Sequence, residues 1–169
     1  MSIANCLNRF DDKALRGALS KCCASTAWAE GMARSRPFPD DDAAIMQAAE
    51  NNWAVLTPDD WREAFSAHPK IGDIDSLRAK FADTKNWAGG EQSGVAGASE
   101  QTLQRLAKLN TKYEQKFGYI FIICATGKSA DEMLASLEAR LPHKPEDEIK
   151  IAAGEQLKIT KLRLEKLVA

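Results

Sequence analysis

Two short stretches of this chain carry side chains that can move protons near neutral pH. The first contains His68, which follows an amphipathic run that includes Ala64 and Phe65, and residues at this spacing lie on one face of a helix. Because Pro69 disfavours the helical conformation in the residue before it, we expect the helix to end at His68. The imidazole then lies at a helix end beside an apolar face. Such a histidine is either a buried core residue or an acid-base group, and this segment alone leaves both readings open.

The second stretch, residues 87–97, has four glycines among eleven residues and includes Glu91 and Gln92. So many glycines exclude a regular helix, which leaves either a solvated loop or part of a site. Glutamate and histidine are a common pair in general acid-base catalysis, and a glutamine amide offers two donors and an acceptor to a urea-like ligand. Glu91 lies 23 residues after His68, across one expected helix. An antiparallel return of the chain would bring both to the same end of a helical bundle.

Helix-start residues and apolar periodicity predict an all-α protein, with about eight helices in a single domain over residues 1–169. The expected helices begin near Asp11 or Asp12, Ser25, Asp40, Thr57, Asp75, Ser99, Ser129 and Pro145. In the helix that follows Asp40, the inward positions are predicted to be Ile45, Met46, Ala49 and Trp53. We interpret the run Asp40–Asp42 as a helix start, since acidic side chains favour that end, and not as a metal site.

Residues 119–125 form a dense apolar run whose pattern fits either a buried strand or a buried short helix. The chain offers no second strand to pair with it, and an isolated strand would leave backbone groups unsatisfied. We therefore expect a buried helical or irregular segment.

Composition narrows the function classes. Charged residues make up 28% and hydrophobic residues 44% of the chain, and the net charge is -1, so we expect no nucleic-acid partner and no membrane association. The four cysteines lack Cys-x-x-Cys spacing, which indicates reduced thiols, a cytoplasmic protein and no metal site. We find no segment that resembles a signal peptide or a membrane span.

Four short motifs are spread from the centre of the chain to its C-terminal part. They are His68-Pro69-Lys70-Ile71-Gly72, Glu91-Gln92-Ser93-Gly94, Tyr113 with Lys116-Phe117-Gly118-Tyr119-Ile120-Phe121, and Lys158-Ile159-Thr160-Lys161-Leu162-Arg163-Leu164. Together with Trp28, Met32 and Arg36-Pro37-Phe38, they resemble the 2-oxo-4-hydroxy-4-carboxy-5-ureidoimidazoline (OHCU) decarboxylases of uric acid degradation. The resemblance runs from about residue 10 to the C-terminus. It implies an all-α homodimer that binds a small ureidoimidazoline substrate, uses no cofactor and forms (S)-allantoin.

The resemblance also implies roles for individual residues. His68 matches the catalytic histidine, Glu91 the active-site carboxylate and Gln92 a substrate-binding amide. The remaining pocket wall matches Pro69 and the backbone of the segment that contains Phe121, Ile122, Ile123 and Ala125. Ala88 takes a substrate-binding position at which many members have serine, so a hydroxyl contact there is lost or supplied by another group. Arg163 matches a family arginine, for which ligand contact, a salt bridge and a helix-end role all remain open.

The chemistry of that substrate fits a histidine and a glutamate. Its carboxylated carbon adjoins a carbon-nitrogen double bond, so the electrons released with carbon dioxide can flow into the ring without a cofactor. The protein must then orient the carboxylate and move protons, for which His68 and Glu91 are the candidates. Two rival functions remain: a non-enzymatic helical interaction domain, and another cofactor-free lyase or hydrolase that acts on a related ureide.

Overall fold

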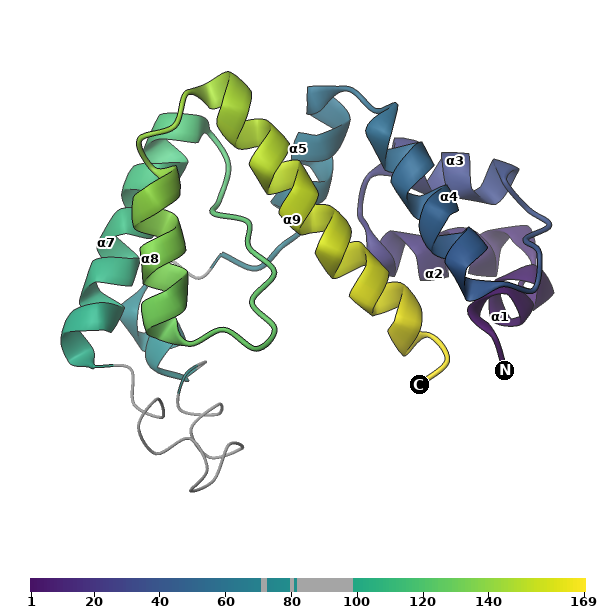
Figure 1. The fold of residues 1–169 in the computed structure, drawn as a ribbon, viewed down its shortest axis with the longest axis horizontal. Helices are drawn as coiled ribbons and strands as arrows, with labels where there is room; N and C mark the ends of the chain where they lie inside the picture. The colour runs from purple at the N-terminus through teal and green to yellow at the C-terminus, as the bar shows by residue number, and fades with distance from the viewer. Residues whose placement is uncertain (71–72, 80, 82–98) are drawn as a thin grey trace. The chain divides into compact units, whose positions relative to one another are not determined.

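The computed structural model describes residues 1–70, 73–79, 81 and 99–169. Every regular element in these residues is a helix, which confirms the all-α prediction (Figure 1). The chain forms two compact units, one made of Met1–His68 with Ile149–Ala169 and the other of Pro69–Glu148. Within the described residues, no helix is both long and apolar enough to span a membrane.

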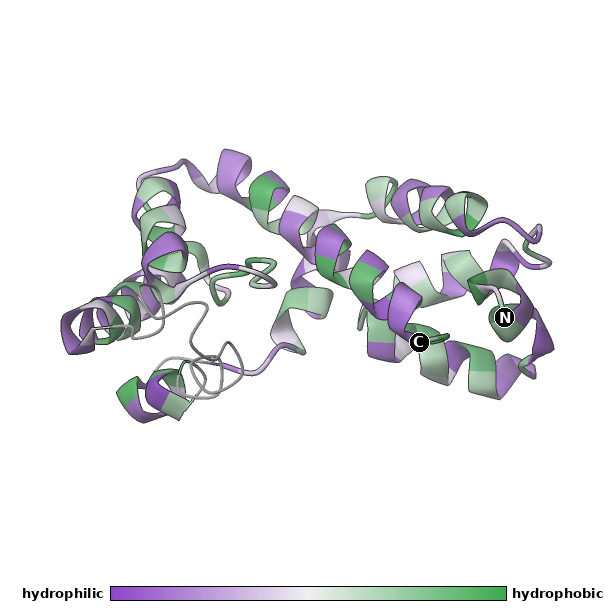
Figure 2. Cartoon of the chain, turned by 60° about the horizontal axis from the view of Figure 1, so that its bottom comes forward, coloured by the Kyte–Doolittle hydropathy of each residue, from purple (hydrophilic) through white to green (hydrophobic). Residues whose placement is uncertain are grey.

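The first unit contains most of the helices. They are α1 (Ile3–Arg9), α2 (Asp12–Cys22), α3 (Thr26–Arg34), α4 (Asp42–Ala54), α5 (Pro58–Ser66) and the larger part of α9 (Pro145–Lys166). Helix α1 was not predicted, because seven residues are too few to show a clear helical period. Hydrophilic and hydrophobic residues alternate along these helices in Figure 2, the pattern of elements that bury one face.

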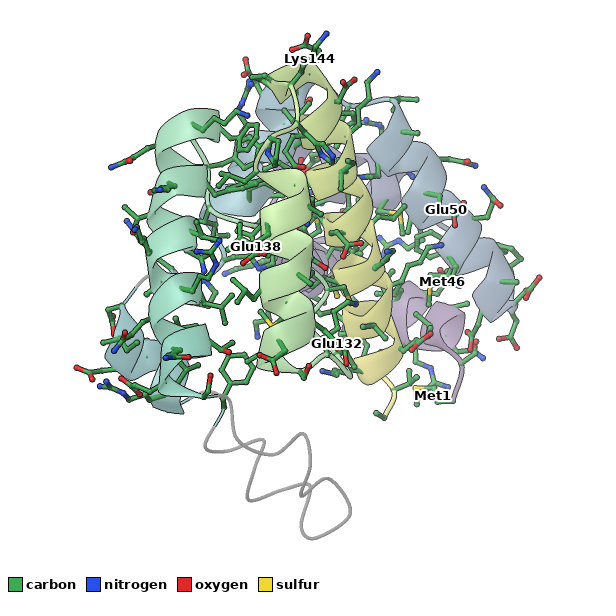
Figure 3. All side chains as sticks on the ribbon, turned by 60° about the vertical axis from the view of Figure 1, so that its left-hand side comes forward. Met1, Met46, Glu50, Glu132, Glu138 and Lys144 are labelled. Carbon is green, nitrogen blue, oxygen red and sulfur yellow. The ribbon has the colours of Figure 1, made fainter. Side chains whose placement is uncertain are left out.

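The three consecutive aspartates do start a helix, as predicted. The side chain of Asp41 caps α4 by accepting a hydrogen bond from the backbone N–H of Ala43 at 2.9 Å. Asp42 accepts from the backbone N–H of Ile3 at 3.0 Å, so the acidic run also ties α4 to α1. Met46 was expected to face inward but is half-exposed at the edge of the buried stripe, and it is labelled on α4 in Figure 3.

Helix α5 is the element that delivers His68. Thr57 caps its start and Pro58 takes the first helical position, as predicted, and Asp60 completes a reciprocal capping box with Thr57. The helix ends at Ser66, two residues earlier than predicted. The backbone N–H of His68 instead bonds to the carbonyl of Phe65 at 3.2 Å, a tightened last turn that precedes the proline.

The second unit is built around α7 (Glu100–Phe117) and α8 (Ala130–Arg140), which lie side by side (Figure 1). Helix α7 starts at the cap residue Ser99 and ends at Gly118, whose φ of 83° is the left-handed conformation that glycine adopts freely. Residues 74–79 are also helical, but the cap is Asp73, which accepts from the backbone N–H of Ser76 at 2.7 Å. The prediction of a cap at Asp75 was wrong, because Asp75 lies inside the first turn and pairs with Arg78.

The apolar run after Gly118 is irregular, as one of the two expected readings had it. Its backbone carbonyls find side-chain partners, since Arg140 donates to the carbonyl of Ile122 at 2.8 Å and Lys128 to that of Cys124 at 2.9 Å. Burial alternates along the run: Ile122 and Cys124 are buried, while Phe121, Ile123 and Ala125 are half-buried. Cationic side chains therefore satisfy carbonyls that would otherwise require a second strand.

Candidate active site

His68 lies just past the end of α5, where it is neither fully buried nor free in solvent. The two residues that bury the inner face of α5, Ala64 and Phe65, hold that end of the helix against the first unit. The half-buried setting agrees with the predicted position of the imidazole, at a helix end beside an apolar face.

The partner of His68 comes from α9, 88 residues further along the chain. Its Nε2 atom is 2.5 Å from Oε1 of Gln156, and the Gln156 amide nitrogen donates to the Thr160 hydroxyl at 3.1 Å. Thr160 in turn donates to the backbone carbonyl of Gln156 at 3.0 Å. Gln156 and Thr160 are both 1% exposed, so this hydrogen-bond chain is shielded from water.

Arg163 lies one turn further along α9 and is half-buried. Its Nη1 atom donates to the backbone carbonyl of Cys22 at 3.4 Å, and within the part of the chain that the structure describes it forms no ion pair. Arg163 also belongs to the last turn of α9, where a cation is favoured. Of the three roles left open by the sequence, the salt bridge is therefore not found among the described residues.

Burial and charge both keep the imidazole neutral. Burial is the largest cause that lowers the pKa of His68 below its usual 6.5, the bond to Gln156 acts in the opposite direction, and the positive charge of Arg163 lowers the pKa further. The pKa of Cys22 is raised to about 11, mainly by burial, and burial also raises that of Cys23. Near neutral pH the site thus combines a neutral imidazole, two protonated thiols and one cation.

The other predicted site residues lie elsewhere. Ala88, Glu91 and Gln92 fall outside the described residues. Pro69 begins the second unit, which also contains Phe121, Ile122, Ile123 and Ala125. That these residues join His68 in one pocket stays a prediction. Ile122 is only 2% exposed within the second unit, and its backbone carbonyl accepts a hydrogen bond from Arg140.

Sequence reasoning missed two polar groups. One is Gln156 with Thr160; the spacing of Gln156, Thr160 and Arg163 places all three along one side of α9, and that polar stripe was the available signal. The other is the buried ion pair of Arg140 with Glu148, with an N–O distance of 2.6 Å in the second unit. Sequence periodicity does not indicate this ion pair, because Arg140 lies on α8 and Glu148 on α9.

The described parts of the chain contain no cluster of potential metal ligands. Over residues 1–70, 73–79, 81 and 99–169, no three His, Cys, Asp or Glu side chains come together as a set of metal ligands. All four cysteines lie in these ranges, and none of them forms a disulfide.

Comparison with known proteins decides the family. The model of the OHCU decarboxylase family matches residues 8–165. This chain belongs to the OHCU decarboxylase family. The match covers both compact units and all four motifs on which the resemblance was based.

Individual members of the family are similar over most of this chain. The uric acid degradation bifunctional protein TTL of Arabidopsis thaliana is 40% identical over 146 residues, which are 86% of this chain but 45% of that protein. The chain thus spans less than half of that relative. The 2-oxo-4-hydroxy-4-carboxy-5-ureidoimidazoline decarboxylase of Haloferax volcanii is 27% identical over 164 residues, 94% of this chain and 91% of that protein. A crystal structure of an OHCU decarboxylase in the presence of (S)-allantoin is 40% identical, covers 88% of this chain and 94% of that one, and has a TM-score of 0.68.

Proposed function

We propose that this chain decarboxylates OHCU to (S)-allantoin in the degradation of uric acid. The Haloferax volcanii relative is named for this decarboxylation, and the 40% identical crystal structure was determined in the presence of (S)-allantoin. The observation that carries the proposal is the setting of His68, a half-buried imidazole with a lowered pKa in a chain of this family. A neutral imidazole at neutral pH is ready to accept a proton.

The reaction needs no external electron acceptor. The bond from C4 of the substrate to its carboxylate breaks, the electron pair forms a double bond between C4 and C5, and the electrons of the C5–N double bond move to nitrogen, which takes up a proton. The resulting enol loses its hydroxyl proton and gains one at C5, which yields allantoin and carbon dioxide. Because the substrate itself accepts the electrons, we propose that the enzyme works without a cofactor.

We propose that His68 and Glu91 share the two proton transfers. His68 is the candidate to accept the proton of the C4 hydroxyl, and Glu91 is the candidate to cooperate or to protonate C5. Gln92 is proposed to bind the ureido or ring-amide edge of the substrate, with Pro69, Ala88 and the 121–125 backbone as pocket wall. Arg163 is close enough to influence the charge on His68, and its cation suits the substrate carboxylate.

We further propose that the protein acts in the cytoplasm as a homodimer and that its two units belong to one domain. The family model supports the last point, because it runs through both units without interruption. The dimer follows from the family resemblance, and the cytoplasmic location follows from the composition and the reduced cysteines.

The direct test follows the conversion of freshly generated OHCU by circular dichroism, in the absence of added metal or cofactor. We expect rapid formation of optically active allantoin, whereas the spontaneous reaction gives the racemate slowly. No acceleration over the spontaneous rate would contradict the proposal and favour a non-enzymatic interaction domain. Turnover of a related ureide with little effect on OHCU would favour the other rival, a different cofactor-free lyase or hydrolase.

A further inference from the structure

The hydrogen bonds around Gln156 determine which way its amide points. The single hydroxyl proton of Thr160 is donated to the backbone carbonyl of Gln156 at 3.0 Å. The hydroxyl oxygen can therefore only accept from the Gln156 side chain, and the group that faces it at 3.1 Å must be the amide nitrogen. Even if the proton turned toward the nearby Cys23 sulfur, the oxygen would still be an acceptor toward Gln156. The amide oxygen is consequently directed at His68.

This orientation leaves one choice for the imidazole. An amide oxygen accepts hydrogen bonds and cannot donate, so Nε2 of His68, at 2.5 Å from it, must carry the hydrogen. With Gln156 and Thr160 each 1% exposed, water cannot take over the hydrogen bonds of a flipped amide. In the neutral histidine, the lone pair is then on Nδ1, which makes no hydrogen bond within the described residues.

We propose that Gln156 is a positioning residue that holds neutral His68 in the Nε2-protonated tautomer and thereby makes Nδ1 the atom that accepts the substrate proton. The proposal rests on the proposed function, in which His68 is the proton acceptor. Thr160 is a positioning residue as well, because its hydroxyl fixes the orientation of the Gln156 amide, which in turn orients the imidazole.

An amide suits this task better than a carboxylate would. A glutamate at position 156 would also accept a hydrogen bond from Nε2, but its charge would stabilise the imidazolium and raise the pKa of His68. Gln156 selects the tautomer through a neutral group, while burial and Arg163 together keep the ring unprotonated. Tautomer and protonation state are thus controlled by different residues.

Nitrogen NMR tests the tautomer directly. The chain has two histidines, so a His143→Asn variant assigns the His68 signals in a long-range proton-nitrogen correlation spectrum. At about pH 8, where an ordinary histidine is neutral, we expect a protonated Nε2 and an unprotonated Nδ1 in the wild-type protein. A proton on Nδ1 would overturn the inference.

Substitutions at the two α9 residues separate positioning from packing. Gln156→Met removes the acceptor at similar volume and should give a mixture of tautomers. It should also lower kcat by about 10- to 100-fold with little change in KM, the loss seen for metal-bound histidines when the partner that orients the ring is removed. Gln156→Glu should keep the proton on Nε2, raise the pKa of His68 and regain part of the rate at high pH. A pure Nε2 tautomer and an unchanged kcat in Gln156→Met would contradict the proposal.

If the Gln156 variants fail to fold, the variants Thr160→Ser and Thr160→Val still test whether the Thr160 hydroxyl fixes the tautomer of His68. Serine retains the hydroxyl and should preserve tautomer and rate, whereas valine keeps the shape, loses the hydroxyl and should reproduce the Gln156→Met spectrum. Equal behaviour of the two variants would overturn the inference. If the wild-type protein had no decarboxylase activity, the proposed function and the catalytic part of this inference would both fail, while the spectra would still decide the tautomer.

Discussion

Arg140 and Glu148 form an ion pair in the interior of the second unit, with side chains that are 8% and 0% exposed. Two guanidinium nitrogens donate to Oε2 of Glu148 at 2.9 and 2.6 Å, and the Tyr113 hydroxyl donates to the same oxygen at 2.5 Å. A third guanidinium nitrogen donates to the carbonyl of Ile122. One buried charge pair thus anchors the irregular 119–125 segment to α8.

Glu148→Gln should therefore destabilise the protein by about 3 to 5 kcal/mol, because it leaves the buried Arg140 guanidinium without a counter-charge. Chemical denaturation monitored by circular dichroism measures the loss. The matched control is Glu138→Gln; Glu138 projects from α8 (Figure 3) and pairs with Arg105 at 2.5 Å, with both side chains about half-exposed. An exposed pair is worth about 0 to 1 kcal/mol, so equal losses in the two variants would refute the buried-pair account.

His68→Asn should preserve the helical fold and lower the decarboxylation rate by about 10²- to 10⁴-fold, the usual contribution of a general acid-base group. The control is His143→Asn, the other histidine of the chain, which is bonded to Glu148 at 3.1 Å in the second unit. That control should keep the wild-type rate. Near-normal turnover by His68→Asn would remove His68 from the chemistry.

The rate should fall in acid as His68 becomes protonated. Because burial and Arg163 lower the pKa of His68, the acid limb of kcat/KM should lie below pH 6.5. Arg163→Gln removes a nearby cation and should move that limb to higher pH, whatever it does to the maximal rate. Lys161→Gln, which removes a cation of the same helix that pairs with Glu50 on α4 (Figure 3), should leave the limb in place. A limb that stays fixed in Arg163→Gln would show that Arg163 does not act on the imidazole.

The lowered pKa of His68 also affects the stability of the protein. Between the lowered pKa of folded His68 and the unfolded value of about 6.5, the unfolded chain binds more protons than the folded one. The contribution of His68 to stability is therefore present above this window and is lost as the pH falls through it. It should be missing from the pH-stability profile of His68→Asn.

Glu91→Gln should slow the reaction and reduce the optical purity of the allantoin. Spontaneous decarboxylation leaves a planar centre that water protonates on either face, whereas an enzyme holds one proton donor on one side. Glutamine nearly preserves the shape of glutamate but has no titratable proton. Chiral analysis of early product, before allantoin racemises, gives the answer. Full rate together with full purity would assign the proton delivery to His68 or to an ordered water.

Substitution by alanine should have opposite effects on stability at two helical glycines, Gly31 and Gly17. A Cβ atom on Gly31 of α3 would come 2.4 Å from Oδ1 of Asn52, whose amide donates to the Ala48 carbonyl at 2.9 Å and to Ser35 at 3.2 Å. Gly31→Ala should thus cost about 1 to 3 kcal/mol through overpacking between α3 and α4. Gly17→Ala in α2 has open space around the new atom and should stabilise by about 0.5 to 1 kcal/mol. Thermal denaturation of both variants tests the contrast, which a gain in Gly31→Ala would contradict.

Local signals accounted for most of the helices and for His68, but not for its partner. Caps at Ser25, Thr57 and Ser99 and the glycine stop at Gly118 are short-range chemistry, and each is where the sequence placed it. The cap at Asp73 was assigned to Asp75 because both aspartates precede the same apolar residues. Gln156 was missed because the polar stripe that it forms with Thr160 and Arg163 does not identify its partner, and that partner, His68, lies 88 residues away in the sequence.

The burial of the Cys22 and Cys23 thiols near Arg163 should make them resistant to oxidation. Thiolates and not thiols react with peroxides and alkylating agents, and with a pKa of about 11 only about one Cys22 in ten thousand is a thiolate at pH 7. Cys23 is buried as well, and the pKa of its thiol is also raised. Oxidants should thus reach the half-exposed Cys6 of α1 first and leave the surroundings of His68 chemically unaltered.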